Sequence, residues 1–152
     1  MASSIFTDLA AGVTTASAEA SEAVGRRLAE ALAADTVLAL HGDLGAGKTT
    51  FVRGLARGLG ITAPVTSPTF AIYSIHRCNR TLVHLDAYRL ESPREVEDLL
   101  LEDFLTSPWC LAIEWPEKIA DWVPPDALHL EFGITPDERH TIRLREAVTP
   151  AG

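Results

Sequence analysis

One segment of the chain, residues 42–49, has the composition and spacing of a phosphate-binding loop. Three of its positions are glycine, which lets the backbone turn tightly and direct its N–H groups at phosphate oxygens. Lys48 can reach the β- and γ-phosphates of a nucleoside triphosphate, and the Thr49 hydroxyl can bind Mg²⁺. The segment fits the pattern G-x-x-x-x-G-K-[ST] at every fixed position and consists of Gly42, Asp43, Leu44, Gly45, Ala46, Gly47, Lys48 and Thr49.

The residues on either side of this loop predict the order strand, loop, helix. Residues 36–41 form a short apolar run, which is typical of a buried parallel strand. After the loop, apolar residues recur at helical spacing, at Phe51, Val52, Leu55 and Leu59. A helix that begins at the loop directs the positive end of its dipole at a bound anion. The alternative is a glycine turn that precedes an ordinary helix.

Two acidic residues follow two other apolar runs. Asp86 follows residues 82–85, and Glu114 follows residues 111–113. Ligands of open α/β sheets bind beyond the carboxyl ends of the strands, so we expect both acids near the loop. Mg²⁺ needs only one or two carboxylates beside Thr49 and the phosphates. One acid would then bind the ion, directly or through water, and the other could orient the attacking water. Each acid could instead cap a helix or be a solvated charge.

Three more residues have open interpretations. Trp115 follows Glu114 and could cover the site, contact a partner or fill the core. His84 shares a strand face with Asp86, and a core or hydrogen-bonded histidine is the favoured interpretation. Gly25 lies inside an expected helix, where it indicates close packing, a nearby ligand or a tolerated glycine.

The elements that must position these residues can be read from the hydrophobic pattern. We expect a helix over residues 17–33, a hairpin of strands 70–75 and 81–86, a strand over 110–113, and a closing hairpin of 127–134 and 140–147. Residues 1–16 are expected to be frayed or strand-like, and residues 148–152 are expected to be frayed. The predicted architecture is a single α/β domain over residues 1–152, a three-layer P-loop NTPase-like fold. Its mixed sheet would have a parallel core and antiparallel hairpins at the sides.

A further helix is expected to begin at Ser92. Ser92 would cap it, Pro93 would occupy its first position, and Glu95 would complete a capping box. Its buried stripe would consist of Val96, Leu99, Leu100 and Phe104. The acidic residues around it form a solvated face or a docking face for a basic partner.

Composition and net charge exclude several classes of protein. The 152 residues carry a net charge of −8, and residues 77–152 alone hold 15 acidic and 8 basic side chains. Strong direct binding to nucleic acid is therefore not expected, and a partner would hold any nucleic acid. Two cysteines are too few for a disulfide scaffold. No apolar run approaches the ~18 residues of a membrane span. No basic residue precedes Arg26, so the positively charged start of a signal peptide is not expected. We expect a cytoplasmic protein.

Four segments together resemble the TsaE family, also called YjeE. They are residues 42–50, 67–70, 84–90 and 114–117, read as GDLGAGKTT, SPTF, HLDAYRL and EWPE. The resemblance covers roughly residues 17–145. It implies a bacterial cytoplasmic ATPase that binds ATP and Mg²⁺ and is required for N6-threonylcarbamoyladenosine in tRNAs that read codons starting with A. It also implies docking onto TsaB and TsaD, hydrolysis that resets their complex, and only indirect contact with tRNA.

The resemblance assigns roles to individual positions. Lys48 and the loop amides through Thr50 would hold phosphates, and Thr49 would bind Mg²⁺. Glu114 would be the second metal-site acid and Asp86 the other essential acid. Two further residues would lie near the nucleotide, Thr69 in a switch segment and Arg139. The chain departs from the family at Ser21, where threonine is common, and at Leu100, where glycine is frequent.

The runner-up function is a small-molecule kinase with a phosphate-binding loop. Such enzymes usually add an arginine-rich lid, but residues 91–126 contain only Arg94 and Lys118 as basic side chains. A regulatory GTPase would normally carry an Asn-Lys-x-Asp motif, which is absent from the sequence. A structural protein with an inactive loop is disfavoured because both candidate acids are present.

Overall fold

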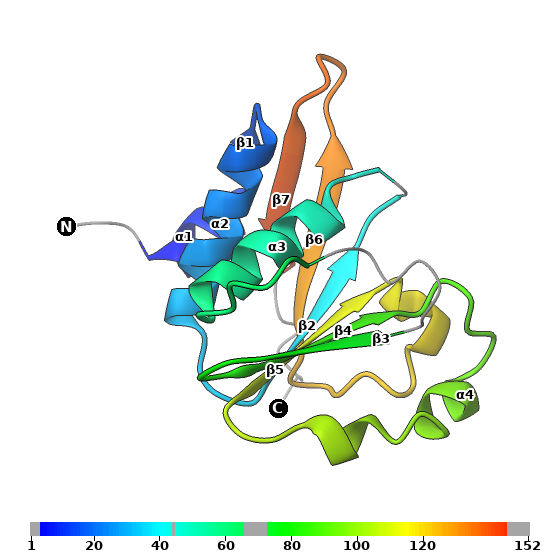
Figure 1. Ribbon diagram of the computed structural model, residues 1–152. Coiled ribbons are helices and arrows are strands. Elements are labelled where there is room, and N and C mark those ends of the chain that lie inside the picture. Colours follow the sequence, from blue (N-terminus) through cyan, green and yellow to red (C-terminus); the bar gives the residue numbers. More distant parts are fainter. Residues whose placement is uncertain (1–3, 44, 66–72, 146–152) are drawn as a thin grey trace, which may run out of the picture.

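The computed structural model describes residues 4–43, 45–65 and 73–145 and is built around a seven-stranded sheet (Figure 1). The strands lie in the order β1-β7-β6-β2-β5-β4-β3. Their bounds are β1 Val13–Thr15, β2 Thr36–His41, β3 Tyr73–Arg77, β4 Thr81–Asp86, β5 Trp109–Glu114, β6 Leu128–Ile134 and β7 His140–Leu144. The helices are α1 Ile5–Ala11, α2 Ala18–Ala31, α3 Lys48–Gly58 and α4 Pro93–Glu97, with 3₁₀ helices η1 Leu101–Phe104 and η2 Pro116–Ile119.

The centre of the sheet is parallel and its sides are antiparallel. Strand β2 pairs in parallel with β5 and β6, and β5 pairs in parallel with β4. The β3–β4 and β6–β7 hairpins are antiparallel, and β1 adds to the outer side of β7. The β3–β4 turn is shorter than expected because β3 continues to Arg77, and residues 70–72 of the expected strand lie outside the described residues. The predicted mixed sheet, with its parallel core and hairpins at the sides, is confirmed.

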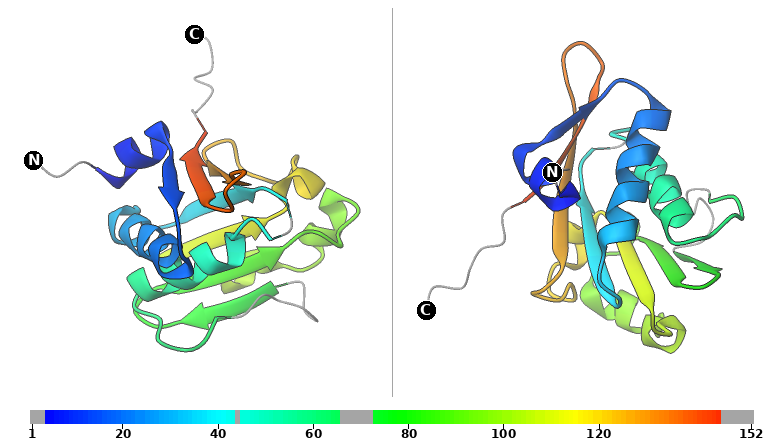
Figure 2. Two further views of the ribbon diagram at one scale, coloured as in Figure 1. Left: turned by 90° about the horizontal axis from the view of Figure 1, so that it is seen from above. Right: turned by 90° about the vertical axis from the view of Figure 1, so that its left-hand side faces the viewer.

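Helices and loops cover the two faces of the sheet unequally. Helices α2 and α3 lie side by side over one face (Figure 2), where Leu28, Phe51 and Leu55 belong to the larger core cluster. The second cluster lies around β4 and β5 and includes Val96 and Leu101, from α4 and η1. The layer on that side is therefore made of short helical segments. In the described residues, no helix combines the length and the apolar character that crossing a membrane requires.

The two long helices approach each other at glycines. A Cβ atom at Gly25 would overlap the carbonyl oxygen of Phe51, and one at Gly54 would overlap that of Glu22. A Cβ atom at Gly58 would lie 2.6 Å from the Arg26 carbonyl oxygen. Of the interpretations of Gly25, the structure supports close packing, which holds the loop-bearing helix α3 against α2.

The N-terminal segment differs from the expectation of fraying. Ile5 and Leu9, one helical turn apart, are 5% and 0% exposed and anchor α1 in the larger core cluster. The Ser4 side chain accepts a hydrogen bond from the Phe6 amide at 3.2 Å and caps the helix. The strand-like alternative holds for β1, where Val13 pairs with Ile142. The expectation for residues 1–16 was wrong over α1 because an i,i+4 apolar pair is too short a periodic signal.

The helix expected after Ser92 is interrupted. Pro93 does occupy its first position, but the Ser92 side chain makes no capping hydrogen bond. Glu95 instead accepts a hydrogen bond from the Glu91 amide at 2.8 Å, so the expected capping box is wrong. Helix α4 ends at Glu97, and Leu100, which directly precedes η1, has φ 53° and ψ 44° and is 59% exposed.

The expected buried stripe is correspondingly incomplete. Val96 is fully buried and Leu99 and Phe104 are half-buried, but Leu100 points to solvent. A left-handed residue turns the chain away from helical geometry, so Leu100 cannot continue the stripe. The spacing alone did not reveal this break because all four residues are apolar.

Candidate functional site

The candidate acids and the loop meet at one edge of the sheet. Strands β2, β5 and β4 are parallel neighbours, so their carboxyl ends lie together. Glu114 is paired in register with Leu40 on one side and with Asp86 on the other. The loop begins directly after β2, at Gly42. The convergence expected from the sequence is therefore present in the fold.

The loop backbone uses the conformations that glycine permits. Gly45 and Gly47 have φ of 82° and 95°, and Gly47 immediately precedes helix α3. At Gly42, φ is 149°, and a Cβ atom there would lie 2.6 Å from the Phe132 carbonyl oxygen. Asp43 is exposed, whereas Ala46 is buried in the larger core cluster. This arrangement leaves the first turn of α3 available to an anion.

Lys48 is buried and lies between the loop and Trp115. Its Nζ donates a hydrogen bond to the Gly42 carbonyl oxygen at 2.5 Å and lies 3.9 Å from the centre of a Trp115 ring. Burial lowers the pKa of the Lys48 ammonium group from its ordinary value, against the opposing effect of the Glu114 charge. The side chain is thus held at the base of the loop, with few protein partners competing for its charge.

Glu114 is buried and accepts two hydrogen bonds on one oxygen. Its Oε2 lies 3.2 Å from the donating Thr49 Oγ1 and 2.6 Å from His84 Nε2. Burial alone would raise the pKa of this carboxyl group, but the His84 hydrogen bond and charge, Lys48 and Thr49 lower it below its ordinary value. Glu114 is therefore an ionised carboxylate in contact with the hydroxyl that the loop supplies.

Asp86 lies beside Glu114 but is more accessible. Its Oδ1 accepts a hydrogen bond from the Tyr88 amide at 3.0 Å, which fixes the turn after β4. Asp86 and Glu114 both line a cavity of about 230 Å³. The other residues that line it are Gly45, Gly47, Lys48, Thr49, Thr50 and Trp115.

A second cavity, of about 390 Å³, adjoins the first and shares Gly45, Gly47 and Thr50 with it. It lies between the start of α2 and the turn from β6 to β7, and its remaining lining is Ala16, Ser17, Ala18, Ser21, Glu138 and His140. A molecule that occupies both cavities would pass directly over the loop glycines.

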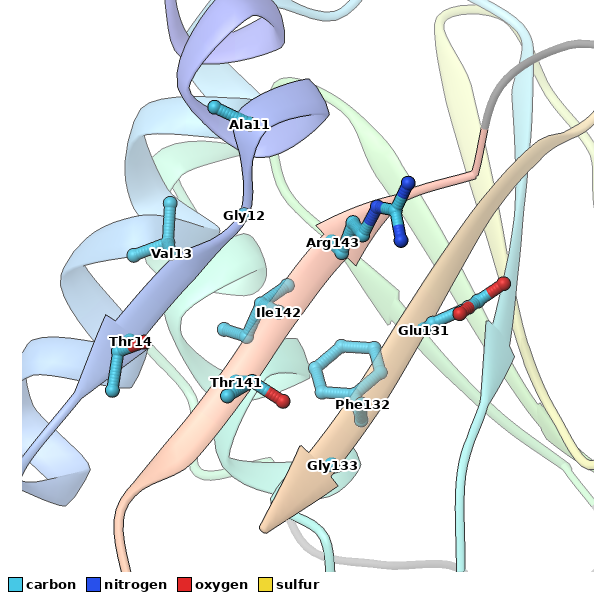
Figure 3. A pocket seen from close by; sticks show the side chains of 10 residues that line it. All are labelled: Ala11, Gly12, Val13, Thr14, Glu131, Phe132, Gly133, Thr141, Ile142 and Arg143. Carbon is cyan, nitrogen blue, oxygen red and sulfur yellow. The ribbon is translucent and has the colours of Figure 1, made fainter. Parts of the chain in front are cut away.

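A third cavity lies away from the loop. It has a volume of about 360 Å³ and is formed by residues 11–14 against β6 and β7 (Figure 3). Glu131 and Arg143 are its charged side chains, and it shares no residue with the two cavities beside the loop. Of the candidate site residues that the structure describes, none lines this third cavity.

Comparison with known proteins matches the same region. The family model described as "Threonylcarbamoyl adenosine biosynthesis protein TsaE" matches residues 15–142. The chain belongs to the TsaE family. The match begins at the end of β1 and contains the loop, both candidate acids and His140. The resemblance predicted from the four motifs is thereby confirmed, and the chain is a member of a family of tRNA threonylcarbamoyladenosine biosynthesis.

Individual TsaE proteins from distant bacteria support the assignment. A protein named tRNA threonylcarbamoyladenosine biosynthesis protein TsaE from Streptomyces coelicolor is 45% identical over 126 residues, or 77% of this chain and 84% of that protein. The protein of the same name from Bacillus subtilis is 37% identical over 129 residues, or 84% and 80%. The crystal structure of Bacillus subtilis YdiB superposes with a TM-score of 0.74 at 31% identity, covering 90% of this chain and 84% of that one.

Not every residue assigned from the TsaE resemblance lies at the cavities. Arg139 is in the β6–β7 turn, where its Nε lies 3.2 Å from Asp137 Oδ2, and it lines neither cavity. Leu44 and Thr69, with the switch segment 67–69, lie outside the described residues. The departure at Ser21 lies in the second cavity, and its hydroxyl is 2.6 Å from that of Thr15.

The departure at Leu100 has a backbone explanation. The TsaE resemblance implies a frequent glycine there, and Leu100 adopts the left-handed conformation that glycine accepts without strain. The substitution therefore keeps the backbone path and adds an exposed apolar side chain.

The structure resolves the interpretation of Trp115. Its φ of 59° lets it turn at the end of β5 and begin η2. Its ring packs on the second core cluster, lies above Lys48 and is 5.1 Å from the Tyr88 ring. Trp115 therefore covers the loop lysine and also contributes to the core, so two of the proposed roles apply together.

Sequence reasoning missed two histidine contacts. His140 Nδ1 lies 3.2 Å from the Ala46 carbonyl oxygen, and its ring supports the loop at Gly47. His84 was expected in the core or hydrogen-bonded, and both hold, but its partner Glu114 was not foreseen. The strand register could have indicated this contact. His84 lies two residues before Asp86 on β4, and Asp86 pairs with Glu114 on the neighbouring strand β5.

Proposed function

We propose that this chain is a Mg²⁺-dependent ATPase that hydrolyses ATP to ADP and phosphate as an accessory protein in N6-threonylcarbamoyladenosine formation on tRNA. One observation carries the proposal. The loop residues Lys48 and Thr49 line a single cavity with the carboxylates Asp86 and Glu114. A phosphate-binding loop with two acids at neighbouring strand ends is the arrangement that phosphoryl transfer to water requires.

The donor set suits magnesium. Thr49, Glu114 and Asp86 offer hard oxygen ligands, and Mg²⁺ needs few of them because it keeps several waters. Within the described ranges, no group of three or more His, Cys, Asp or Glu side chains could hold a metal. The ion would therefore depend on Thr49, one or two acids and the ATP phosphates. When bound, Mg²⁺ would neutralise negative charge that develops on the transferred phosphoryl group.

The contacts suggest separate roles for the two acids. Glu114 already touches the Thr49 hydroxyl and is the better metal-side ligand. Asp86 is more exposed in the same cavity, and this accessibility supports a role in which it would orient the attacking water. Lys48 and the loop amides, including Thr50, would hold the phosphates, and Trp115 would keep water away from Lys48.

The adjoining cavity is suited to the nucleoside. It begins at the shared glycines and Thr50 and runs to Ser21 and His140. A triphosphate over the loop would leave the sugar and base on this side. Ser21 is already bonded to Thr15, so its hydroxyl would offer the base limited hydrogen-bonding capacity.

In the proposed accessory role, partner proteins bind the tRNA. TsaD and TsaB, which the family resemblance implies, would hold the tRNA in the cytoplasm, and this chain would act on their complex. The net charge of −8 supports this division, because a strongly acidic protein binds nucleic acid poorly by itself.

The test is ATP hydrolysis by the purified chain, alone and with TsaB and TsaD. We expect slow turnover alone, faster turnover with the partners, and loss of both in Glu114→Gln. Asp121→Asn, an exposed acid outside the cavities, is the matched control and should behave as wild type. ATP turnover that is changed neither by the partners nor by Glu114→Gln would refute the proposal. Transfer of phosphate to a metabolite would favour the small-molecule kinase instead.

A further inference from the structure

A buried histidine lies behind the candidate metal-side acid. His84 is 0% exposed in β4, and its Nε2 lies 2.6 Å from Glu114 Oε2 on the neighbouring strand β5. Its other ring nitrogen, Nδ1, is also buried and has no hydrogen-bond partner among the described residues. Buried polar atoms are rarely left unpaired, so this arrangement calls for an explanation.

The hydrogen bond between His84 and Glu114 determines which ring nitrogen of His84 carries a proton. An ionised carboxylate only accepts hydrogen bonds, so His84 Nε2 must donate to Glu114. A neutral ring then carries its proton on Nε2 and leaves Nδ1 with a lone pair. The 2.6 Å geometry thus places a proton on Nε2, directed at Glu114 Oε2.

The same hydrogen bond restricts the orientation of the Glu114 carboxylate. Among the described residues, both hydrogen bonds to Glu114 end on Oε2, one from His84 and one from Thr49. The oxygen Oε1 makes no hydrogen bond to the described residues, and Glu114 lines the first cavity, where a ligand could use this oxygen. Without His84, the Thr49 bond of 3.2 Å would be the remaining restraint, and Thr49 is itself a candidate metal ligand.

We propose that His84 is a positioning residue, which holds the Glu114 carboxylate through an Nε2–H bond in the orientation in which it would ligate Mg²⁺. This inference rests on the proposed function, because it concerns the same metal site. His84 lines neither cavity beside the loop, so it acts through Glu114 and not on the substrate.

The test compares two substitutions in the full chain. His84→Gln keeps an amide donor near the position of Nε2, whereas His84→Leu has a similar volume and no donor. His76→Leu is the matched control, because His76 lies on the neighbouring strand β3 and bonds Ser74 rather than Glu114. The measurement is ADP binding by calorimetry, with Mg²⁺ and with a chelator, and thermal unfolding checks that each variant is folded.

The expected result is a selective loss of the magnesium effect. In His84→Leu, the gain in ADP affinity on adding Mg²⁺ should fall at least tenfold, while affinity in chelator stays within about twofold. His84→Gln and His76→Leu should keep the gain within about threefold. A wild-type gain in folded His84→Leu would overturn the inference, as would an equal loss in folded His84→Gln.

A spectroscopic measurement separates this inference from the proposed function. In ¹⁵N-histidine-labelled protein without nucleotide, the His84 ring should show a protonated Nε2. Glu114→Gln should change the Nε2–H signal, and a ring protonated only at Nδ1 would overturn the inference. If wild-type protein shows no magnesium effect, the proposed function fails, and these spectra still decide whether His84 holds Glu114.

Discussion

At the scale of single residues, the site depends on charges held in a buried environment. Lys48 and Glu114 are 4% and 6% exposed, yet each keeps close polar contacts. Such side chains are costly to bury without a ligand and are pre-organised for one. Substitutions here should therefore affect ligand binding more than stability.

Lys48→Met should weaken ATP binding without unfolding the protein. Methionine keeps the apolar stem and removes the charge, and a charge-assisted hydrogen bond is worth about 1.5–3 kcal/mol, or roughly 10–100-fold in affinity. Calorimetric titration with ATP measures the loss. Lys118→Met, at an exposed lysine that lines neither cavity, is the control and should stay within about twofold. Unchanged affinity in Lys48→Met would contradict the assignment of the loop.

His41, at the end of β2, should make stability depend on pH. Burial, then Arg145 and His129, lowers its pKa from 6.5 to about 4. Between these values the unfolded chain binds the proton and the folded chain does not. The free energy of unfolding should therefore fall as pH drops from 6.5 to 4, by clearly less than the ~3 kcal/mol of the full shift, because solvent screens the partly exposed ring.

Urea unfolding at several pH values tests this prediction. His41→Gln removes the titrating ring and can still hydrogen-bond His129, which lies 2.7 Å from His41 in the wild type. The variant should show a smaller loss of stability between pH 6.5 and 4. An identical pH profile in the two proteins would assign the effect to other groups.

At the scale of elements, local geometry overrides apolar spacing at Leu100. This residue separates α4 from η1 in a left-handed conformation and is largely exposed. A non-glycine residue there costs about 1–2 kcal/mol, whereas glycine loses about 0.5–1 kcal/mol of its unfolded-state freedom. The balance favours glycine.

Leu100→Gly should therefore raise the free energy of unfolding, by about 0.5–1 kcal/mol. Leu99→Gly is the matched control, because Leu99 is half-buried against the second core cluster and its replacement should destabilise. Chemical denaturation of both variants measures the difference. Destabilisation by Leu100→Gly would mean that the exposed leucine side chain makes a contact of its own.

At the scale of the whole molecule, the sheet joins distant parts of the chain. Strand β1 pairs with β7, and α1 contributes to the larger core cluster. The first elements therefore stabilise the side of the sheet that carries the β6–β7 hairpin. That hairpin supplies His140 and Glu138 to the second cavity.

Removal of residues 1–12 should destabilise the whole fold. Burial of Ile5 and Leu9 contributes about 1.5–3 kcal/mol each, so we expect a loss of about 3–6 kcal/mol in the free energy of unfolding. Leu9→Ala alone should cost about 2–5 kcal/mol. Asp8→Ala, which removes a surface ion pair with Arg27, is the control and should cost less than about 1 kcal/mol. A fully stable truncated chain would mean that α1 is dispensable.

The loop, the order of the major elements and the position of both acids at strand ends could all be predicted from the amino-acid sequence. These features follow from local rules: glycine conformations, the period of apolar residues and the edge at which parallel strands end. Family membership followed from the same motifs, because they preserve type and spacing along the chain.

The contacts between side chains could not be predicted in this way, because they depend on how the elements pack. The contact of His84 with Glu114 joins residues 30 positions apart and depends on the register of β4 and β5. The left-handed turn at Leu100 and the burial of α1 depend on packing against other elements, which residue spacing does not encode. Arg139 shows that neighbours in sequence can lie apart from a site. It directly precedes His140, but His140 lines the second cavity and Arg139 does not. Local rules fix elements, whereas contacts follow from how the elements pack.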